Sequence, residues 1–298
     1  MRRTCVIGRG FAEIAVGAEK PLAIIAGPCV LESPALAAEI AQRLRDACAR
    51  LGLSYVFKAS FDKANRSSAG SPRGPGLGEG LAQIAEVRER FRVPVTTDIH
   101  EPAQAETVAR AVDLLQIPAF LCRQTDLLIA AGRAAAAHGR AVNIKKGQFV
   151  SPAEMEGPVA KVERGGCGEI MLTERGTFFG YGRLVNDFLG LGDMMDMLGE
   201  RSPPVCFDCT HSTQQPGASG AGEGRVSGGR PERAPMLARA AVAAGVDAVF
   251  LECHPDPPKA HSDAATALPL KDVPAILESL AHVREAARRW REPLRRDA

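Results

Sequence analysis

The sequence predicts an α/β protein that folds as a single (β/α)8 TIM barrel. Its 298 residues suit one barrel of about 250 residues, although two smaller domains stay open on length alone. Eight short segments are almost continuously apolar, as expected for parallel strands buried on both faces. Helical patterns alternate with them, which is typical of βα units. We expect an N-terminal extension (1–20), a catalytic barrel (21–290) and a basic tail (291–298).

The first half of the chain supplies four strand–helix units. Ser33 and Pro34 provide an N-cap and a first-turn proline for a helix that ends near Leu51. In residues 1–20, the sequence around Gly8 to Gly10 is compatible with a short β-hairpin. The predicted strands are residues 22–26, 55–59, 93–97 and 114–117, and the later helices cover 77–91, start at Pro102 and cover 127–137.

The second half supplies four more units. The strands are predicted at residues 141–144, 169–173, 205–208 and 248–251, with helices from Pro152, Pro235 and Lys271 and a less regular segment up to Leu198. Residues 214–229 are rich in glycine and do not have the composition of a packed element. A mobile flap over the barrel mouth and an idle surface insertion are equally good interpretations of this segment.

Composition restricts the partners. A formal charge of +2 and a pI of about 8.1 give no broad basic field, which disfavours nucleic acid and favours small anionic ligands. We find no secretory signal and no apolar run of the roughly 18 residues that a membrane helix needs. We therefore expect a soluble, cytoplasmic protein without membrane contact. Eight cysteines are too sparse for a disulfide scaffold.

Polar side chains follow the predicted strands one after another. In a barrel the eight strand tips converge on one face, where such folds carry their chemistry. The residues that follow the strands in turn are Cys29, Lys58, Asp98, Ala119, Lys145, Arg175, His211 and Glu252, all with polar side chains except Ala119. The glycine-rich segment 74–80 is a poorer candidate, because no strand directly precedes it as a nucleotide-binding loop requires.

One group of these residues is basic. Lys58, Lys63 and Arg66 lie within nine residues, and Lys145 and Arg175 follow later strands. Guanidinium forks and ammonium groups suit phosphate and carboxylate oxygens, although each such cation taken alone is more often an ordinary surface charge. Together they would repel one another unless a multiply charged anion neutralised them. The sequence therefore predicts a substrate with at least two anionic groups.

A second group consists of Cys29, His211, Glu252 and Asp263. A thiol, an imidazole and two carboxylates fit Zn²⁺, Fe²⁺, Mn²⁺ or Co²⁺ without choosing among them. The alternative is that Cys29 is a small buried apolar residue and His211 a hydrogen-bonded core histidine. Cys206 and Cys209 form a lone C-x-x-C at a strand end, which is a weak signal for zinc or redox chemistry.

Nine segments resemble the 3-deoxy-D-manno-octulosonate 8-phosphate synthase family. The run Ala-Asn-Arg-Ser-Ser at 64–68 separates this resemblance from the related 3-deoxy-D-arabino-heptulosonate 7-phosphate synthases, which carry Pro-Arg-Thr there. The match extends from about Leu22 to Leu270. The segments are GPCVLES (27–33), FKASFDKANRSS (57–68), TDIHEP (97–102), QIPAF (116–120), RQTD (123–126), KKGQF (145–149), TERG (173–176), FGY (179–181) and ECHPDP (252–257).

The resemblance implies an activity, a cofactor and an assembly. Phosphoenolpyruvate and D-arabinose 5-phosphate would condense with water to 3-deoxy-D-manno-octulosonate 8-phosphate and inorganic phosphate, on the pathway to the octulosonate of lipopolysaccharide. The family has metal-dependent and metal-independent members, and the latter carry asparagine where this chain has Cys29. The segment Ser262-Asp263-Ala264 also resembles the metal-dependent pattern, so the resemblance implies one divalent ion. Family members are usually homotetramers.

The resemblance also assigns roles to individual residues. Lys58, Lys63, Lys145 and Arg175, with Gln116 and the Ala119 amide, would bind phosphoenolpyruvate. Asn65, Arg66 and Ser67 would bind the pentose phosphate, with Arg66 reaching into a neighbouring subunit. We add Ser60 and Gln148 to the substrate-binding set, and we expect Cys29, Asp98, Lys145 and His211 to be catalytic, with the last two as candidate proton carriers.

Two other functions stay open from the sequence. Several lysines at one mouth would also suit a Schiff-base aldolase, which borohydride trapping would reveal. A barrel that has lost activity and only binds phosphosugars or metal is the other alternative, because fold does not fix function.

Overall fold

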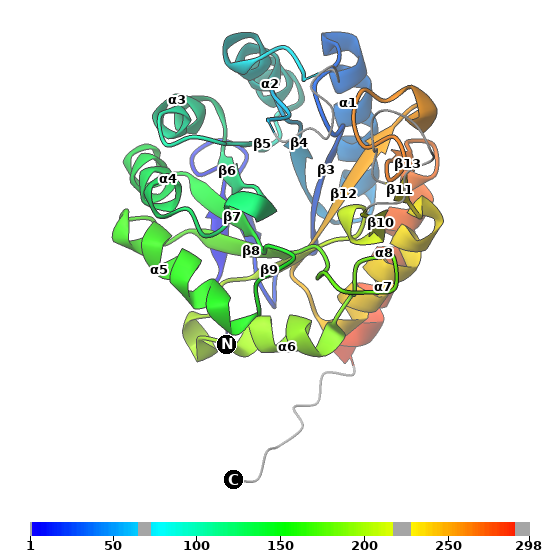
Figure 1. Ribbon diagram of the computed structural model, residues 1–298. Coiled ribbons are helices and arrows are strands. Elements are labelled where there is room, and N and C mark those ends of the chain that lie inside the picture. Colours follow the sequence, from blue (N-terminus) through cyan, green and yellow to red (C-terminus); the bar gives the residue numbers. More distant parts are fainter. Residues whose placement is uncertain (1, 65–72, 217–227, 290–298) are drawn as a thin grey trace.

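Eight parallel strands close into a barrel in this computed structural model, which describes residues 2–64, 73–216 and 228–289 (Figure 1). Each strand pairs with its neighbour along the chain, and the last pairs with both the first and the seventh, which closes the sheet. The strands are β3 (Ala23–Gly27), β4 (Ser54–Lys58), β5 (Val95–Asp98), β6 (Leu114–Ile117), β7 (Ala141–Lys145), β8 (Ile170–Glu174), β9 (Val205–Asp208) and β12 (Ala248–His254). The predicted (β/α)8 fold is confirmed.

Eight α-helices surround this barrel in the described part of the chain (Figure 1). Their apolar faces pack on the outside of the strands and form the larger of two hydrophobic clusters. The helices are α1 (Pro34–Arg50), α2 (Leu77–Phe91), α3 (Gln104–Ala111), α4 (Thr125–His138), α5 (Glu156–Arg164), α6 (Phe188–Asp196), α7 (Ala234–Ala244) and α8 (Val273–Arg289). As predicted, Ser33 caps α1, accepting a hydrogen bond from the Leu36 amide at 3.2 Å.

The structure corrects some predicted boundaries. The segment before Leu198 was expected to be irregular, but it contains α6, whose amide of Leu189 is capped by the Asp187 carboxylate. Gly190 and Gly192 dilute its helical pattern in the sequence. The last barrel strand extends three residues beyond its predicted end at Leu251, because its end pairs with a short strand, β13 (Leu268–Pro269).

The predicted N-terminal hairpin is present and closes one end of the barrel. Strands β1 (Cys5–Ile7) and β2 (Ile14–Val16) pair antiparallel. Cys5, Ile7 and Val16 pack against the inward side chains at the beginnings of the barrel strands, including Ala23 and Ala141. The opposite, C-terminal end of the barrel is therefore the one available for ligands.

Some predictions fall outside the described residues. These are Asn65, Arg66 and Ser67, the centre of the glycine-rich segment and the basic tail. The two ends of that segment are described and pair with each other as strands β10 (Gln214–Gln215) and β11 (Gly228–Gly229). Among the described helices, none has both the length and the apolar character needed to cross a membrane.

Candidate active site

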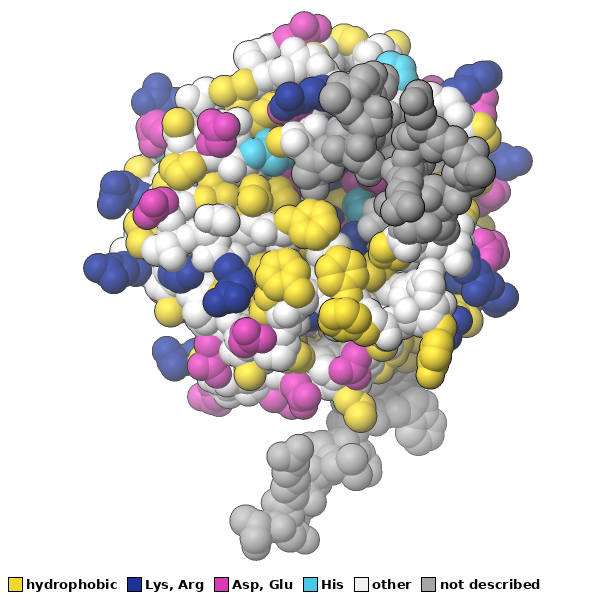
Figure 2. All heavy atoms as spheres, in the orientation of Figure 1, with side chains coloured by type: hydrophobic (Ala, Val, Ile, Leu, Met, Phe, Trp, Pro, Cys, Tyr) yellow, Lys and Arg dark blue, Asp and Glu magenta, His cyan; other side chains and the backbone are white. Residues whose placement is uncertain are grey.

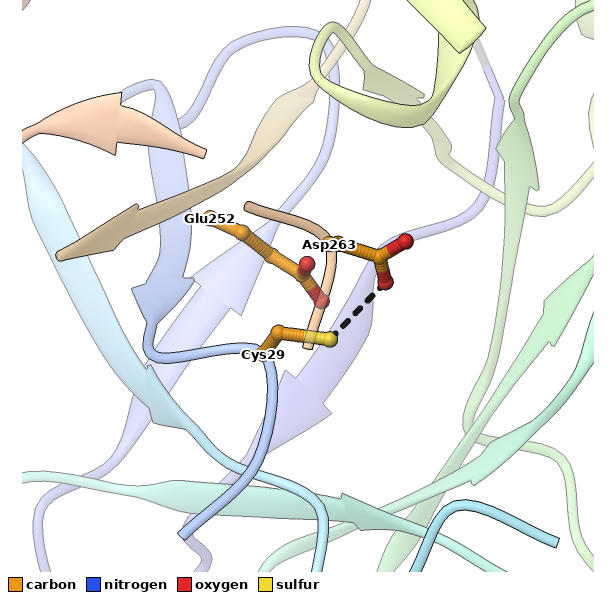
Figure 3. Close-up of side chains that lie close together, drawn as sticks. All are labelled: Cys29, Glu252 and Asp263. Carbon is orange, nitrogen blue, oxygen red and sulfur yellow. Dashed lines mark hydrogen bonds between the residues drawn. The ribbon is translucent and has the colours of Figure 1, made fainter. Parts of the chain in front are cut away.

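The thiol, imidazole and two carboxylates predicted from the sequence lie together at the C-terminal end of the barrel. Ligand atoms of Cys29, Glu252 and Asp263 all lie within 4.8 Å of one another, and their side chains point toward a common centre (Figure 3). The Cys29 thiol donates a hydrogen bond to Asp263 Oδ2 at 2.9 Å. His211 Nε2 lies 3.6 Å from Glu252 Oε2 and 3.6 Å from Asp263 Oδ2.

This cluster fits a divalent cation. Burial, and after it the charges of Asp263 and Glu252, raises the pKa of the Cys29 thiol well above its ordinary value, so the thiol carries its proton when no cation is nearby. Within the described residues, Glu252 Oε2 is buried and has no hydrogen-bond partner. A buried carboxylate oxygen without a donor is costly, and a cation would satisfy it. One thiolate, one imidazole and two carboxylates are ligands that Zn²⁺, Fe²⁺ and Co²⁺ accept.

Asp208, at the end of β9, orients the imidazole of this cluster. Its Oδ2 lies 2.7 Å from His211 Nδ1 and accepts a hydrogen bond from Lys145 Nζ at 2.7 Å. Its Oδ1 accepts from the His211 amide at 2.9 Å. Burial raises the pKa of Asp208, but His211 and Lys145 outweigh it and leave the pKa below its ordinary value. An ionised Asp208 holds the proton on Nδ1, so Nε2 is the atom that would give up its proton and bind a cation at the cluster.

Asp208 was not among the site residues predicted from the sequence. Its only signal was its place at a strand end, three residues before His211. Burial lowers the pKa of His211, while Asp208 and then Glu252 raise it, with a net increase. The structure thus adds a carboxylate that links a predicted cation, Lys145, to a predicted metal ligand.

Two lysines that were grouped with the substrate-binding cations are ion-paired to carboxylates at the mouth. Lys58 Nζ lies 2.5 Å from Glu252 Oε1 and donates to the Cys29 carbonyl at 2.8 Å. Lys145 Nζ bonds Asp208 and lies 3.6 Å from the centre of the Phe250 ring. Both side chains are buried, so each cation balances a buried negative charge.

Asp98 is the centre of a second polar network. Its Oδ2 accepts from Ser60 Oγ at 2.7 Å, and Ser60 Oγ in turn accepts from Lys63 Nζ at 3.0 Å. Gln116 Nε2 donates to Asp98 Oδ1, and Asn143 Nδ2 donates to Gln116 Oε1 at 3.0 Å. Burial raises the pKa of Asp98, but the nearby cations, with Lys63 first, lower it by more than burial raises it. The pKa of Asp98 is therefore below its ordinary value. Four predicted site residues therefore share one network.

Arg175 and Gln148 each have a buried polar atom that no other described residue uses. In the described part of the chain, Arg175 Nη1 and Gln148 Oε1 are buried without a hydrogen-bond partner. Arg175 Nη2 donates to Gln214 Oε1 at 2.5 Å. Burial lowers the pKa of Arg175. A buried guanidinium N–H that lacks an acceptor can donate a hydrogen bond to an anionic ligand.

The basic and acidic groups form one constellation. Lys63, Lys58 and Lys145 all act electrostatically on Asp98, while Asp208, Asp263 and Glu252 act on Arg175. Ala119, at the beginning of the 3-10 helix Ala119–Leu121 after β6, is nearly buried, and its carbonyl lies against Gly147 in the loop that follows β7. The structure therefore brings the predicted site residues of the described ranges to one mouth.

Comparison with known proteins gives a family and many relatives. The model of the DAHP synthetase I family matches residues 5–289. A protein of Cyanothece sp. is 50% identical over 274 residues, covering 92% of this chain and 96% of the relative. Proteins of Rhodopseudomonas palustris (52% over 268 residues, 90% of each chain) and Koribacter versatilis (51% over 274 residues, 92% and 95%) are similar. All three bear the name 2-dehydro-3-deoxyphosphooctonate aldolase.

Proposed function

The chain belongs to the DAHP synthetase I family, among its 2-dehydro-3-deoxyphosphooctonate aldolases, and from this premise we propose its reaction. It condenses phosphoenolpyruvate with D-arabinose 5-phosphate and water, giving 3-deoxy-D-manno-octulosonate 8-phosphate and inorganic phosphate. One observation carries the proposal beyond the family name: a basic group and a metal-ligand cluster meet at the same barrel mouth. The reaction needs both, because it joins two anionic molecules at a carbonyl.

Binding of phosphoenolpyruvate falls to the cations around Arg175. Arg175 Nη1, which has no partner among the described residues, and the ammonium of Lys63 would bind phosphate or carboxylate oxygens. Gln148, whose buried Oε1 has no partner among the described residues, is a further polar group in the loop that follows β7. The pentose phosphate would be held by Asn65, Arg66 and Ser67, as the family resemblance implies. Holding two reactants face to face contributes much of the rate by orientation alone.

One divalent ion of the Zn, Fe, Mn or Co class would be held by Cys29, His211, Glu252 and Asp263. When bound, such an ion would supply Lewis acidity to the sugar aldehyde or to the attacking water. Asp208 fixes the tautomer of His211 that this set requires. Lys58 neutralises part of the negative charge of the cluster through Glu252.

The chemical steps then follow from the reactants. C3 of phosphoenolpyruvate attacks the aldehyde carbon, water adds at C2, and the resulting tetrahedral centre expels inorganic phosphate. Lys145 and His211 share the Asp208 carboxylate, so they can hold or pass the protons that the aldehyde oxygen gains and the water loses. Asp98 keeps Lys63 and Gln116 in place through its two oxygens.

A Schiff-base mechanism fits the geometry less well. A Schiff base needs a lysine with a free amine lone pair. The Nζ atoms of Lys58 and Lys145 instead lie in close ion pairs with Glu252 and Asp208, at 2.5 Å and 2.7 Å, so both are already engaged by carboxylates.

We further propose a homotetramer working in the cytoplasm on the lipopolysaccharide pathway. Phosphorylated substrates of this kind are metabolites of the cell interior. Several large apolar side chains are exposed on the mouth face and support association between subunits (Figure 2).

Release of inorganic phosphate tests the reaction. We expect release from phosphoenolpyruvate with arabinose 5-phosphate, and little with erythrose 4-phosphate, which is one carbon shorter. A chelator should abolish release with arabinose 5-phosphate, and added Zn²⁺ or Co²⁺ should restore it. Full activity after complete metal removal would refute the metal proposal, and a preference for erythrose 4-phosphate would refute the substrate.

A further inference from the structure

Gln214 joins the two halves of the candidate site. Its Oε1 accepts from Arg175 Nη2 at 2.5 Å, and its Nε2 donates to Asp263 Oδ1 at 3.4 Å. Arg175 belongs to the cations proposed for phosphoenolpyruvate and Asp263 to the proposed metal ligands. A single amide therefore connects an anion-binding arm with a metal-binding carboxylate.

The backbone strand that pairs with Gln214 packs against the turn at residues 263–266, which carries Asp263. Gln214 pairs with Gly229 across the β10–β11 ribbon. A Cβ on Gly229 would lie 2.4 Å from Thr266 Cγ2 and 2.5 Å from the Ala265 carbonyl oxygen, so this strand is pressed onto residues 265 and 266. The amide of Thr266 in turn donates to the Asp263 carbonyl at 2.9 Å.

Asp263 depends on such support. Its φ of 51° lies in the left-handed region, which costs energy for a residue other than glycine and needs neighbours to hold it. Oδ2 of this carboxylate accepts from Cys29, and Oδ1 accepts from Gln214. A shift of the amide would therefore shift the carboxylate that faces Cys29 and His211.

From these contacts we propose that Gln214 is a positioning residue that couples the binding of phosphoenolpyruvate to the binding of the metal ion. This inference rests on the proposed function. An anion on Arg175 fixes the guanidinium, the guanidinium fixes the amide, and the amide fixes Asp263 for its metal. Because coupling between two ligands is reciprocal, the metal must tighten phosphoenolpyruvate by the same factor.

The test measures the two affinities separately and together. Tag-free protein is stripped with a chelator and titrated with Co²⁺, whose thiolate charge-transfer band reports binding at Cys29. The titration is repeated with saturating phosphoenolpyruvate, and the ratio of the two dissociation constants is the coupling factor. Calorimetric titration with phosphoenolpyruvate, in the presence and absence of Co²⁺, gives the same coupling factor as the ratio of the two dissociation constants for phosphoenolpyruvate.

In Gln214→Ala we expect the coupling factor to fall about fivefold, which corresponds to the loss of one ordinary hydrogen bond. Gln215→Ala is the matched control, because it removes the same side chain from the next position of the ribbon, and it should keep the wild-type factor. If Gln214 had a purely structural role, its loss would lower the affinity for each ligand by the same amount with and without the other ligand. The coupling factor would then stay unchanged. An unchanged coupling factor in Gln214→Ala would overturn only the proposed coupling through Gln214. Failure of the wild type to bind phosphoenolpyruvate would overturn both this coupling and the proposed function.

Discussion

At the scale of single residues, Asp208 is the group on which the mouth most depends. It holds the imidazole of His211 and the ammonium of Lys145 with one carboxylate oxygen, 2.7 Å from each. A carboxylate behind a metal-binding histidine fixes both its tautomer and the direction of its ring.

Replacement of Asp208 by asparagine should weaken metal binding. The asparagine amide can no longer accept charge-assisted hydrogen bonds from both partners, so we expect a loss of about 10- to 100-fold in Co²⁺ affinity. Titration of the thiolate charge-transfer band measures this loss, and Asp196→Asn on the exposed face of α6 is the control. Wild-type affinity in Asp208→Asn would show that His211 is oriented by other contacts.

The proposed metal ligands could be picked out from the sequence, but Asp208 could not. Cys29, Glu252 and Asp263 carry side chains whose chemistry is rare in combination, so their types alone suggest a metal. An aspartate at a strand end is common and suggests nothing specific. Only the 2.7 Å contacts of Asp208 reveal its role.

At the scale of elements, the N-terminal hairpin closes the barrel end opposite the site. Glu169, just before β8, fastens it by accepting from the Val6 amide at 2.7 Å and from Arg9 at 2.7 Å. Both are hydrogen bonds to an ionised acceptor, which are stronger than neutral ones.

Glu169→Ala should therefore destabilise the protein without changing its chemistry. We expect the free energy of unfolding to fall by about 1–3 kcal/mol, since the variant leaves a partly buried amide unpaired. Urea denaturation measures the loss, and kcat/KM should stay at the wild-type value. Glu163→Ala is the control: it removes an ion pair with Arg3 from a carboxylate that is more exposed than that of Glu169, and it should cost no more than about 1 kcal/mol. A large fall in kcat/KM for Glu169→Ala would mean that the hairpin end influences the mouth.

Element types were easier to predict than their limits. The apolar runs predict strands, because runs that are apolar throughout suit a parallel sheet whose two faces are both covered. Their ends depend on neighbours: β12 continues to His254 because β13 is there to pair with it. The helix α6 was missed because its stability comes from packing of Leu191, Met194 and Met195, which outweighs two glycines.

At the scale of the whole molecule, exposed apolar side chains call for an explanation. Phe179 and Tyr181 are 97% and 99% exposed in the single chain, and Leu189 is 84% exposed. Hydrophobic side chains gather on the mouth face (Figure 2). Side chains of this size are seldom left in water in such number, so a subunit interface is the natural cover.

Polar substitution on this face should break the proposed tetramer. We expect Phe179→Ser/Tyr181→Ser to shift the protein to dimers or monomers in size-exclusion chromatography with light scattering. A double serine variant at Glu39 and Arg50, both exposed on α1, should keep the wild-type mass. A tetramer that survives the first variant would place the interface elsewhere, and a monomeric wild type would refute the assembly.

The sequence by itself determined the barrel and which types of side chain lie at its mouth. Eight apolar runs that alternate with helices suit a closed parallel barrel covered by helices, and that arrangement brings every strand end to the same side. The side-chain types at those ends then indicated anions and a metal.

Only the tertiary structure decided which polar groups face one another. Cys29 meets Asp263 across 234 positions of the chain, and Lys58 meets Glu252 across 194. These contacts arise because closure brings β12 against β3, so that their ends become neighbours. Distances of a few ångströms depend on register, loop path and burial, and none of these can be read from residue types along a chain.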